Sequence, residues 1–287
     1  MEELVQCGRA YGAVTGAKEN VSNERGTVLL KNKVAIVTGG GRGIGKAIAK
    51  RFAAEGAAVV VSSRTDTEIR QVTEEIRGAG GRAEAVAADV SREADCERIV
   101  EAARKAFGGI HILVNNAGVY GPVQPVEKIS PSQWDEVIAA NLRGPFLMSR
   151  LVLPEMYKQK DGAILNITSI AGKAAMQLNS PYAASKAGLA GLTRTLAAEA
   201  AQKGVRVNAI SPGPVSETRM SQELGQGLAD YFHADKEFLF KNMLRSILQG
   251  RPQTADEIAA AAVFLVSSEA GAITGQTLNV DGGMAFY

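Results

Sequence analysis

Short runs of apolar residues alternate with amphipathic stretches along most of the chain, starting near Lys33. The runs have the continuity of strands that are buried on both faces, and the stretches between them carry apolar residues at helical spacing. The sequence predicts seven strands, at residues 34–37, 58–61, 83–88, 110–115, 162–168, 205–210 and 276–280. The first three helices are predicted at residues 44–55, 66–77 and 94–107. Strands that alternate with helices form a parallel sheet covered on both faces, so we predict a single doubly wound α/β domain.

The first 30 residues lack this pattern. They are rich in glycine, serine and asparagine and show no apolar period. We interpret residues 1–30 as an extension ahead of the domain, disordered in part or draped over it, and residues 31–287 as the domain itself.

Composition and charge narrow the classes of function. Lys and Arg number 32 against 30 Asp and Glu, so the net charge of +2 argues against nucleic acid as a partner. The two cysteines, Cys7 and Cys96, and the two histidines have no metal-ligand spacing, so no metal site is expected. The acidic start without an apolar core and the absence of long apolar runs predict a cytoplasmic protein that has no membrane partner. The chain has 31 glycines, more than an average protein of this length, and the motifs described below contain several of them.

A glycine-rich turn follows the first predicted strand, from Thr38 to Gly45. Glycine permits a tight turn and a close approach of the backbone to a ligand, and the start of a helix offers N–H groups to a phosphate. Its place between strand and helix favours a pyrophosphate site over an ordinary turn. The glycines at 39, 43 and 45 do not have the GxGxxG spacing of the common dehydrogenases.

Further motifs follow in order: Asn115-Asn116-Ala117-Gly118, Tyr182-xxx-Lys186, and the ending Val280-Asp281-Gly282-Gly283. Together with the turn at 38–45 they resemble the short-chain dehydrogenase/reductase family over residues 31–287. The likeness is greatest to the branch that contains 3-oxoacyl-carrier-protein reductases and many sugar or alcohol dehydrogenases. It implies a Rossmann-like fold, a nicotinamide cofactor, a small-molecule carbonyl or alcohol substrate and a homotetramer.

The end of the second predicted strand bears on the choice of cofactor. An enzyme that prefers NAD usually carries an acidic residue there for the ribose hydroxyls. This chain has Ser63 and Arg64 instead, and Arg42 lies in the glycine turn. A hydroxyl and two guanidinium groups suit a 2′-phosphate, so we predict NADP(H) over NAD(H). Asp66 lies close enough in sequence to weaken this argument, and solvated arginines are the alternative.

The resemblance implies several other cofactor contacts. The residues it places at the nucleotide are Gly39, Gly43, Ile44, Gly45, Asp89, Val90, Asn116, Ala117, Gly118, Tyr182, Lys186, Pro212, Gly213, Val215 and Thr218. Taken singly, Asp89 is also typical of a helix start and the asparagines of a tight turn. An extra residue ahead of Thr218 departs from the family pattern and weakens that assignment.

Tyr182 and Lys186 lie four apart on a predicted helix and so share one face. A phenol has a pKa near 10, and a neighbouring ammonium would lower that pKa toward the range of a useful general acid or base. The resemblance adds Ser169, which would polarise the substrate carbonyl, and Asn141, which would hold a water that relays protons to Lys186. Lys186 would also hold the nicotinamide ribose.

Three functions remain open from the sequence. The favoured one is an NADP(H)-dependent oxidoreductase that transfers hydride between nicotinamide and a ketone or secondary alcohol. The alternatives are an NAD-dependent sugar or polyol dehydrogenase and a non-catalytic NADP-sensing protein. Residues 216–250 are long and apolar, and the resemblance makes them a substrate lid.

Overall fold

The computed structural model describes residues 28–216 and 218–286. Seven strands form one parallel sheet in the order β3-β2-β1-β4-β5-β6-β7. The strands are β1 (Val34–Thr38), β2 (Ala58–Ser63), β3 (Arg82–Ala87), β4 (Ile112–Asn115), β5 (Gly162–Ile167), β6 (Val205–Pro212) and β7 (Thr277–Val280). The predicted doubly wound, Rossmann-like fold is therefore confirmed, and each predicted strand is present to within two residues at either end.

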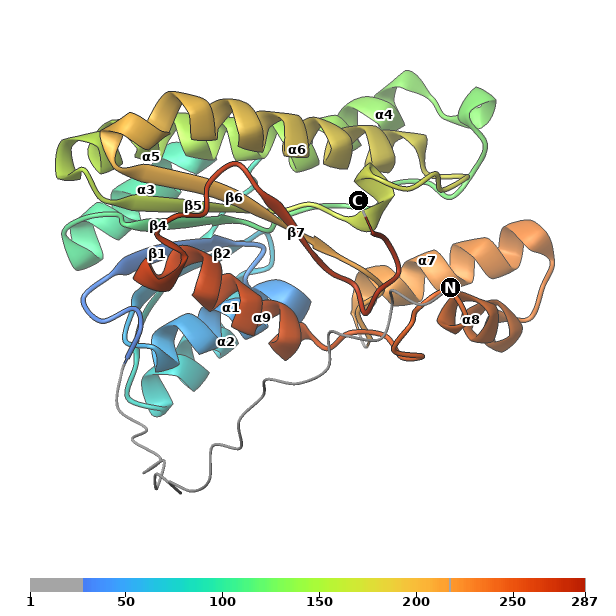
Figure 1. Ribbon diagram of the computed structural model, residues 1–287, viewed down its shortest axis with the longest axis horizontal. Helices are drawn as coiled ribbons and strands as arrows, with labels where there is room; N and C mark the ends of the chain where they lie inside the picture. Colours follow the sequence, from blue (N-terminus) through green and yellow to red (C-terminus); the bar gives the residue numbers. More distant parts are fainter. Residues whose placement is uncertain (1–27, 217, 287) are drawn as a thin grey trace, which may run out of the picture.

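Helices cover both faces of the sheet (Figure 1). One layer contains α1 (Gly43–Ala54), α2 (Asp66–Gly78) and α9 (Ala255–Val266). The other contains α3 (Glu93–Phe107), α5 (Gly144–Gln159) and α6 (Ser180–Ala200). Beyond these layers lie α4 (Pro131–Ile138), α7 (Arg219–Phe232) and α8 (Lys236–Leu244), with α7 and α8 projecting to one side of the body.

The central strands divide their side chains between two apolar cores. Ala35 and Val37 of β1 pack with α1, α2 and α9, whereas Val34 and Ile36 pack with α3 and α5. This alternation follows from the two-residue period of a strand, and burial on both faces explains why the whole strand is apolar. Every residue of β1 is buried.

The strand order reverses between β1 and β4, which are neighbours in the sheet although β2 and β3 lie between them in the chain. The loops that leave the two strands therefore diverge to opposite sides, and a crevice opens at their carboxyl ends. The side chain of Asn116, after β4, crosses this crevice and donates to the carbonyls of Thr38 (2.9 Å) and Gly39 (3.0 Å), after β1.

The predicted extension over residues 1–30 needs one correction, at its inner end. Leu30 is 1% exposed and belongs to the apolar core, and its N–H donates to the Glu55 carbonyl at 2.9 Å. The packed domain therefore includes residues 29 and 30, because their leucine side chains add to the α1 and α9 layer. Residues 1–27 of the predicted extension lie outside the described residues.

Within the described part of the chain, no helix is both long enough and apolar enough to cross a membrane. The same residues contain no group of His, Cys, Asp and Glu side chains that could hold a metal ion. Cys96 is buried, and burial raises the pKa of its thiol to about 11, which makes it an inert packing residue.

Candidate active site

Two adjoining hollows lie at the carboxyl ends of the strands. The larger, of about 610 Å³, lies beyond β1, β2 and β4, and the smaller, of about 110 Å³, lies beyond β5 and β6. They share Ile44, Asn116, Gly118, Thr218 and Met220 as walls, so they form one continuous cleft.

The structure brings almost all the predicted site residues to this cleft. The larger hollow is lined by Gly39, Arg42, Gly43, Ile44, Gly45, Ser63, Arg64, Asp89, Val90, Asn116, Ala117, Gly118 and Thr218. The smaller is lined by Ser169, Tyr182, Lys186, Pro212, Gly213 and Val215. Asn141 is the exception, since it is fully buried behind the cleft wall.

The glycine turn is shaped by close approach of the backbone. A methyl group on Gly45 would come within 2.2 Å of the Gly39 carbonyl oxygen, so no side chain fits there. Thr38 fixes the turn against the next loop, because its hydroxyl accepts the N–H groups of Asn116 and Ala117, both at 3.1 Å. The turn and the loop after β4 are therefore one hydrogen-bonded unit.

The start of α1 offers N–H groups to an anion. Helices α2 and α3 carry acidic side chains in their first turns, whereas α1 has none and receives no capping hydrogen bond from the side chain of Arg42. Uncapped N–H groups and the positive end of the helix dipole attract a phosphate, and a carboxylate in that turn would repel it.

The arginines at the far end of the cleft have different surroundings. Arg42 Nη1 pairs with Glu68 Oε1 at 3.0 Å, and the Arg42 side chain is 50% exposed. Arg64 forms no ion pair or side-chain hydrogen bond with any described residue, and it lines the same hollow. Asp66, which the sequence placed near this end, pairs instead with Arg70 at 2.6 Å. Glu68 is the carboxylate that sequence reasoning missed.

Asp89 and Thr218 both line the larger hollow while stabilising a helix start. Asp89 Oδ1 accepts the N–H of Ser91 at 2.9 Å and its hydroxyl at 2.8 Å, just ahead of α3. Thr218 is the N-cap of α7, where its hydroxyl accepts the Ser221 N–H at 3.2 Å. The departure from the family pattern ahead of Thr218 therefore leaves this threonine at the cleft wall, but its hydroxyl is already engaged in capping.

Tyr182 and Lys186 project from the first two turns of α6 into the smaller hollow. Their side chains are nearly enclosed, at 7% and 4% exposure of the residues. Lys186 Nζ donates to the Ile167 carbonyl at 2.8 Å and lies 5.6 Å from the centre of the Tyr182 ring. The four-residue spacing thus places both groups on one face, as predicted.

The predicted lowering of the Tyr182 pKa is wrong for the structure described. Burial raises the pKa of Tyr182 to about 12, the Ser169 side chain acts in the opposite sense through hydrogen bonding, and Tyr120 adds to the rise. Burial also lowers the pKa of Lys186 to about 8. A low dielectric disfavours both charged forms, and this outweighs the expected attraction between ammonium and phenolate.

Asn141 lies in one turn of π-helix, Ala139–Arg143, between α4 and α5. Its side-chain oxygen accepts the Val119 N–H at 2.8 Å, and its amide donates to the Val119 carbonyl at 2.8 Å and to Ser185 Oγ at 3.1 Å. A methyl group on Gly118 would lie 3.0 Å from Asn141 Oδ1 and 3.6 Å from Lys186 Nζ. Asn141 therefore fixes the loop that borders Lys186, and π-helical turns are frequent at functional sites.

Two neighbours of Tyr182, and a hydrogen-bond partner of one of them, were not predicted. The Tyr120 ring stacks on it with centres 4.7 Å apart, and the Asn179 amide donates to the Tyr120 hydroxyl at 2.8 Å. Met220 Sδ lies 3.9 Å from the Tyr182 hydroxyl. The sequence gives only a weak signal for Tyr120, its place two residues after the Asn-Ala-Gly loop, and none for the approach of Met220.

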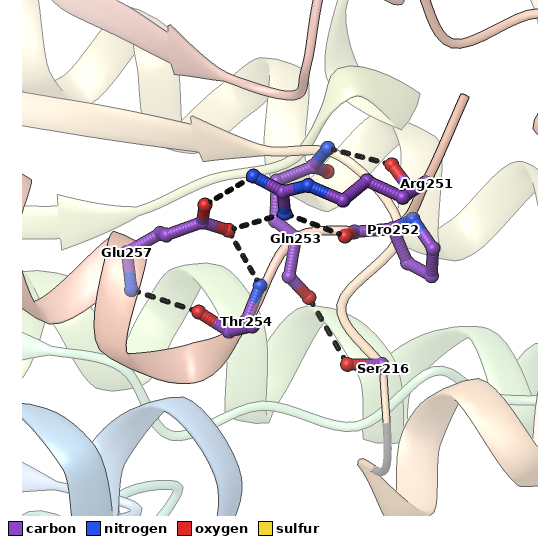
Figure 2. A network of polar contacts seen from close by, with 6 residues as sticks. All are labelled: Ser216, Arg251, Pro252, Gln253, Thr254 and Glu257. Carbon is purple, nitrogen blue, oxygen red and sulfur yellow. Dashed lines mark hydrogen bonds and ion pairs between the residues drawn. The ribbon is translucent and has the colours of Figure 1, made fainter. Parts of the chain in front are cut away.

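A polar network fixes the loop after β6 (Figure 2). The Gln253 carbonyl accepts the N–H and the hydroxyl of Ser216, and its own N–H donates to the Pro214 carbonyl at 2.9 Å. Glu257 forms a capping box with Thr254 at the start of α9 and a two-pronged ion pair with Arg251, at 2.6 and 3.0 Å. The two ends of the segment 216–250 are therefore held next to each other, by the hydrogen bonds of Gln253 with Pro214 and Ser216.

Comparison with known proteins agrees with this geometry. Residues 33–229 match the family model described as short chain dehydrogenase. The short-chain reductase protein NovJ of Streptomyces niveus is 42% identical over 88% of this chain and 94% of its own length. The 3beta-hydroxysteroid dehydrogenase 1 of Eggerthella lenta is 40% identical over 90% of this chain and 95% of its own.

Among solved structures, levodione reductase superposes with a TM-score of 0.85 at 33% identity, covering 88% of this chain and 98% of that one. The matching family model, the relatives and the fold agree with the motifs around the cleft. This chain belongs to the short-chain dehydrogenase/reductase family, whose members are oxidoreductase enzymes that use a nicotinamide nucleotide.

Proposed function

We propose that the protein is an NADP(H)-dependent oxidoreductase that interconverts a ketone and a secondary alcohol. The observation that carries the proposal is the convergence of Ser169, Tyr182 and Lys186 on a small hollow that opens into a cleft of nucleotide size. The retained pair of Tyr182 and Lys186 argues against a non-catalytic nucleotide sensor.

The residues of the larger hollow suit a dinucleotide. The tight turn at Gly39, Gly43 and Gly45 and the uncapped start of α1 would hold the pyrophosphate. Asp89, Val90 and the loop Asn116–Gly118 would border the adenosine. Pro212, Gly213, Val215 and Thr218 would border the nicotinamide, and Ile44 lies between the two ends.

A bound nicotinamide supplies or accepts a hydride at its ring. The chain's own task is to manage the substrate oxygen and its proton. We assign Tyr182 as general acid in reduction and general base in oxidation, and Ser169 as the hydrogen-bond donor that polarises the carbonyl. A phenol that keeps its proton, as burial favours here, suits the reductive direction.

Lys186 would replenish the proton and hold the nicotinamide ribose. A pKa of about 8 allows the side chain to lose a proton as the ammonium and to regain it as the amine near neutral pH. The side chain of Asn141 donates both amide hydrogens and accepts one hydrogen bond, so a relay water held by Asn141 would donate to one of its oxygen atoms.

The preference for NADP(H) rests on Arg64, Arg42 and Ser63, which together line the far end of the cleft. Guanidinium groups bind phosphate through charge-assisted hydrogen bonds. The relevant alternative is an NAD-dependent sugar or polyol dehydrogenase, which the carboxylate of Glu68 at this end favours.

The part of the substrate side that packs around Tyr182 is apolar. Tyr120, Val123, Met220 and Leu224 line it and pack around Tyr182. We assign residues 216–250 as the substrate lid, because α7 contributes Met220 and Leu224 to this wall and the segment is braced at one point. A ketone with an apolar substituent fits these walls better than a polyol.

We extend the proposal to the rest of the chain on the strength of family membership. The enzyme domain spans residues 29–287 with an extension ahead of it, and it works in the cytoplasm as a homotetramer. Light scattering on the full chain tests the assembly, for which a mass near four chains is expected and a monomer would contradict it.

The decisive experiment is a panel of ketones, acetoacetyl thioesters and keto-sugars, offered with NADPH and with NADH. We expect loss of the NADPH absorbance with at least one apolar ketone. Binding of NADPH without turnover of any substrate would favour the sensor, and faster oxidation of sugars with NAD+ would favour the alternative dehydrogenase.

A further inference from the structure

A carboxylate lies among the cations at the adenosine end of the cleft. Glu68, in the first turn of α2, accepts a hydrogen bond from Arg42 through Oε1 at 3.0 Å. Its side chain is 33% exposed, and it lines the larger hollow together with Arg42 and Arg64. The group that was predicted to attract phosphate therefore already has an anionic partner.

The second carboxylate oxygen of Glu68 faces the glycine turn. A methyl group on Gly41 would come within 3.1 Å of Glu68 Oε2 and 3.2 Å of the Ser63 hydroxyl. The carboxylate and the hydroxyl thus meet over the same point of the backbone. Ser63 is the residue proposed to receive the 2′-substituent of the adenosine ribose, so Glu68 lies where that substituent would arrive.

Other charges nearby are engaged elsewhere. Asp66 pairs with Arg70, and Lys46 and Lys50 both pair with Glu75 farther along α2. The charged side chains that line this end are Arg42, Arg64, Glu68 and Asp89. Asp89 accepts hydrogen bonds from Ser91, so Glu68 is the carboxylate that pairs with an arginine of this end.

We propose that Glu68 determines the cofactor selectivity of this enzyme by competing with the 2′-phosphate of NADP(H) for Arg42. This inference rests on the proposed nucleotide site. Binding of NADP(H) separates Arg42 from Glu68 and brings two anions together, whereas NAD(H) leaves the ion pair intact and offers its 2′-hydroxyl to the carboxylate. Glu68 therefore narrows a preference for NADP(H) that Arg42 and Arg64 create.

The test is the affinity of the full-length protein for NADP+ and for NAD+, measured by titration calorimetry on the wild type and Glu68→Gln. The amide keeps the size of the side chain and removes its charge. We expect NADP+ to bind about fivefold tighter, the change that corresponds to one partly exposed charge pair, with NAD+ unchanged or weaker. Glu74→Gln, the same change on α2 outside the cleft, should leave both affinities as they are.

A second comparison removes Arg42, the residue for which Glu68 and the 2′-phosphate would compete. In an Arg42→Gln background, Glu68→Gln should change the NADP+ affinity less than it does in the wild type, because the pair is already broken. Glu68→Ala repeats the test without a side chain that could bond to Arg42, and thermal unfolding of each variant confirms that it folds.

The outcomes separate this inference from the proposed function. If the wild type prefers NADP+ and Glu68→Gln leaves the ratio of affinities unchanged, Glu68 has no part in selectivity while the proposed function stands. If the wild type prefers NAD+ and Arg64→Ala weakens both cofactors equally, the NADP assignment fails. If the affinity for NADP+ relative to NAD+ still rises in Glu68→Gln, the role of Glu68 is supported even though the NADP assignment has failed.

Discussion

The two ends of the cleft treat charge in opposite ways. At the end proposed for the adenosine, Arg42 and Glu68 form an ion pair whose side chains are 50% and 33% exposed. At the other end, Lys186 is 4% exposed, and the one hydrogen bond of its ammonium within the described chain goes to a neutral carbonyl. An exposed pair contributes about 1 kcal/mol or less, whereas a buried ammonium without a counter-charge is costly.

Exposure decides which property a charge at each end can change. Single charges at the exposed end can shift binding of one cofactor against another by small factors. At the buried end, desolvation raises the pKa of Tyr182 and lowers that of Lys186. The loss or gain of a single charge there would therefore alter proton transfer itself.

The largest effect is expected from Lys186→Met. Loss of the ammonium should lower kcat by about 100-fold or more, as for other general acid–base groups. The same substitution should stabilise the fold by up to about 3 kcal/mol at neutral pH, because a pKa lowered from 10.5 to about 8 measures the cost of burying the charge. Steady-state rates test the loss of activity and urea unfolding tests the gain in stability. A variant that is active and less stable would show that Lys186 is neither catalytic nor costly to bury.

The pH dependence of that stability gap follows from the same shift. As pH rises from about 8 to 10.5, the unfolded chain holds more protons at Lys186 than the folded chain does. The cost of burying Lys186 therefore disappears across this window, and the wild type should approach the stability of Lys186→Met. Urea unfolding of both proteins at several pH values below 10, before Tyr182 titrates, measures the gap. A gap that stays constant would show that Lys186 is not desolvated.

Met220→Ala should have an intermediate effect. Its sulfur lies 3.9 Å from the Tyr182 hydroxyl, so truncation enlarges the smaller hollow beside the proposed proton donor. We expect KM for bulky apolar ketones to fall severalfold while KM for small ketones rises. Met243→Ala in α8, outside the walls of the cleft, is the matched control. Equal changes for large and small ketones would argue against Met220 as part of the substrate wall.

The smallest effect is expected from Arg42→Gln on stability. The pair with Glu68 is exposed, so the free energy of unfolding should change by no more than about 0.5 kcal/mol. Urea unfolding of Arg42→Gln and Lys186→Met under the same conditions compares how much each end contributes to the free energy of unfolding. A loss of several kcal/mol would mean that the exposed end is as strongly coupled to the fold as the buried one.

The sequence predicted features that depend on local order. Continuous apolar runs gave the strands, since strands buried on both faces must be apolar, and the four-residue spacing of Tyr182 and Lys186 gave their shared face. The sequence also predicted a tight turn at Gly45. The Gly39 carbonyl lies so close to Gly45 that a residue with a side chain would not fit there.

Features that depend on long-range packing escaped prediction. Glu68 meets Arg42 across 26 residues, and Tyr120 stacks on a ring 62 positions away, contacts that no local pattern encodes. The direction of the Tyr182 pKa was wrong because the sequence shows a nearby lysine but not the burial that both groups share.

Replacement of Tyr182 shows whether this residue transfers the proton in a nicotinamide-dependent reduction. Tyr182→Phe removes the hydroxyl and keeps the ring that stacks on Tyr120. With the ketone that the wild type reduces fastest, NADPH oxidation should fall by about 100-fold or more, while the affinity for NADPH stays within about twofold. Activity near that of the wild type, with NADPH still bound, would show that Tyr182 is not the proton donor.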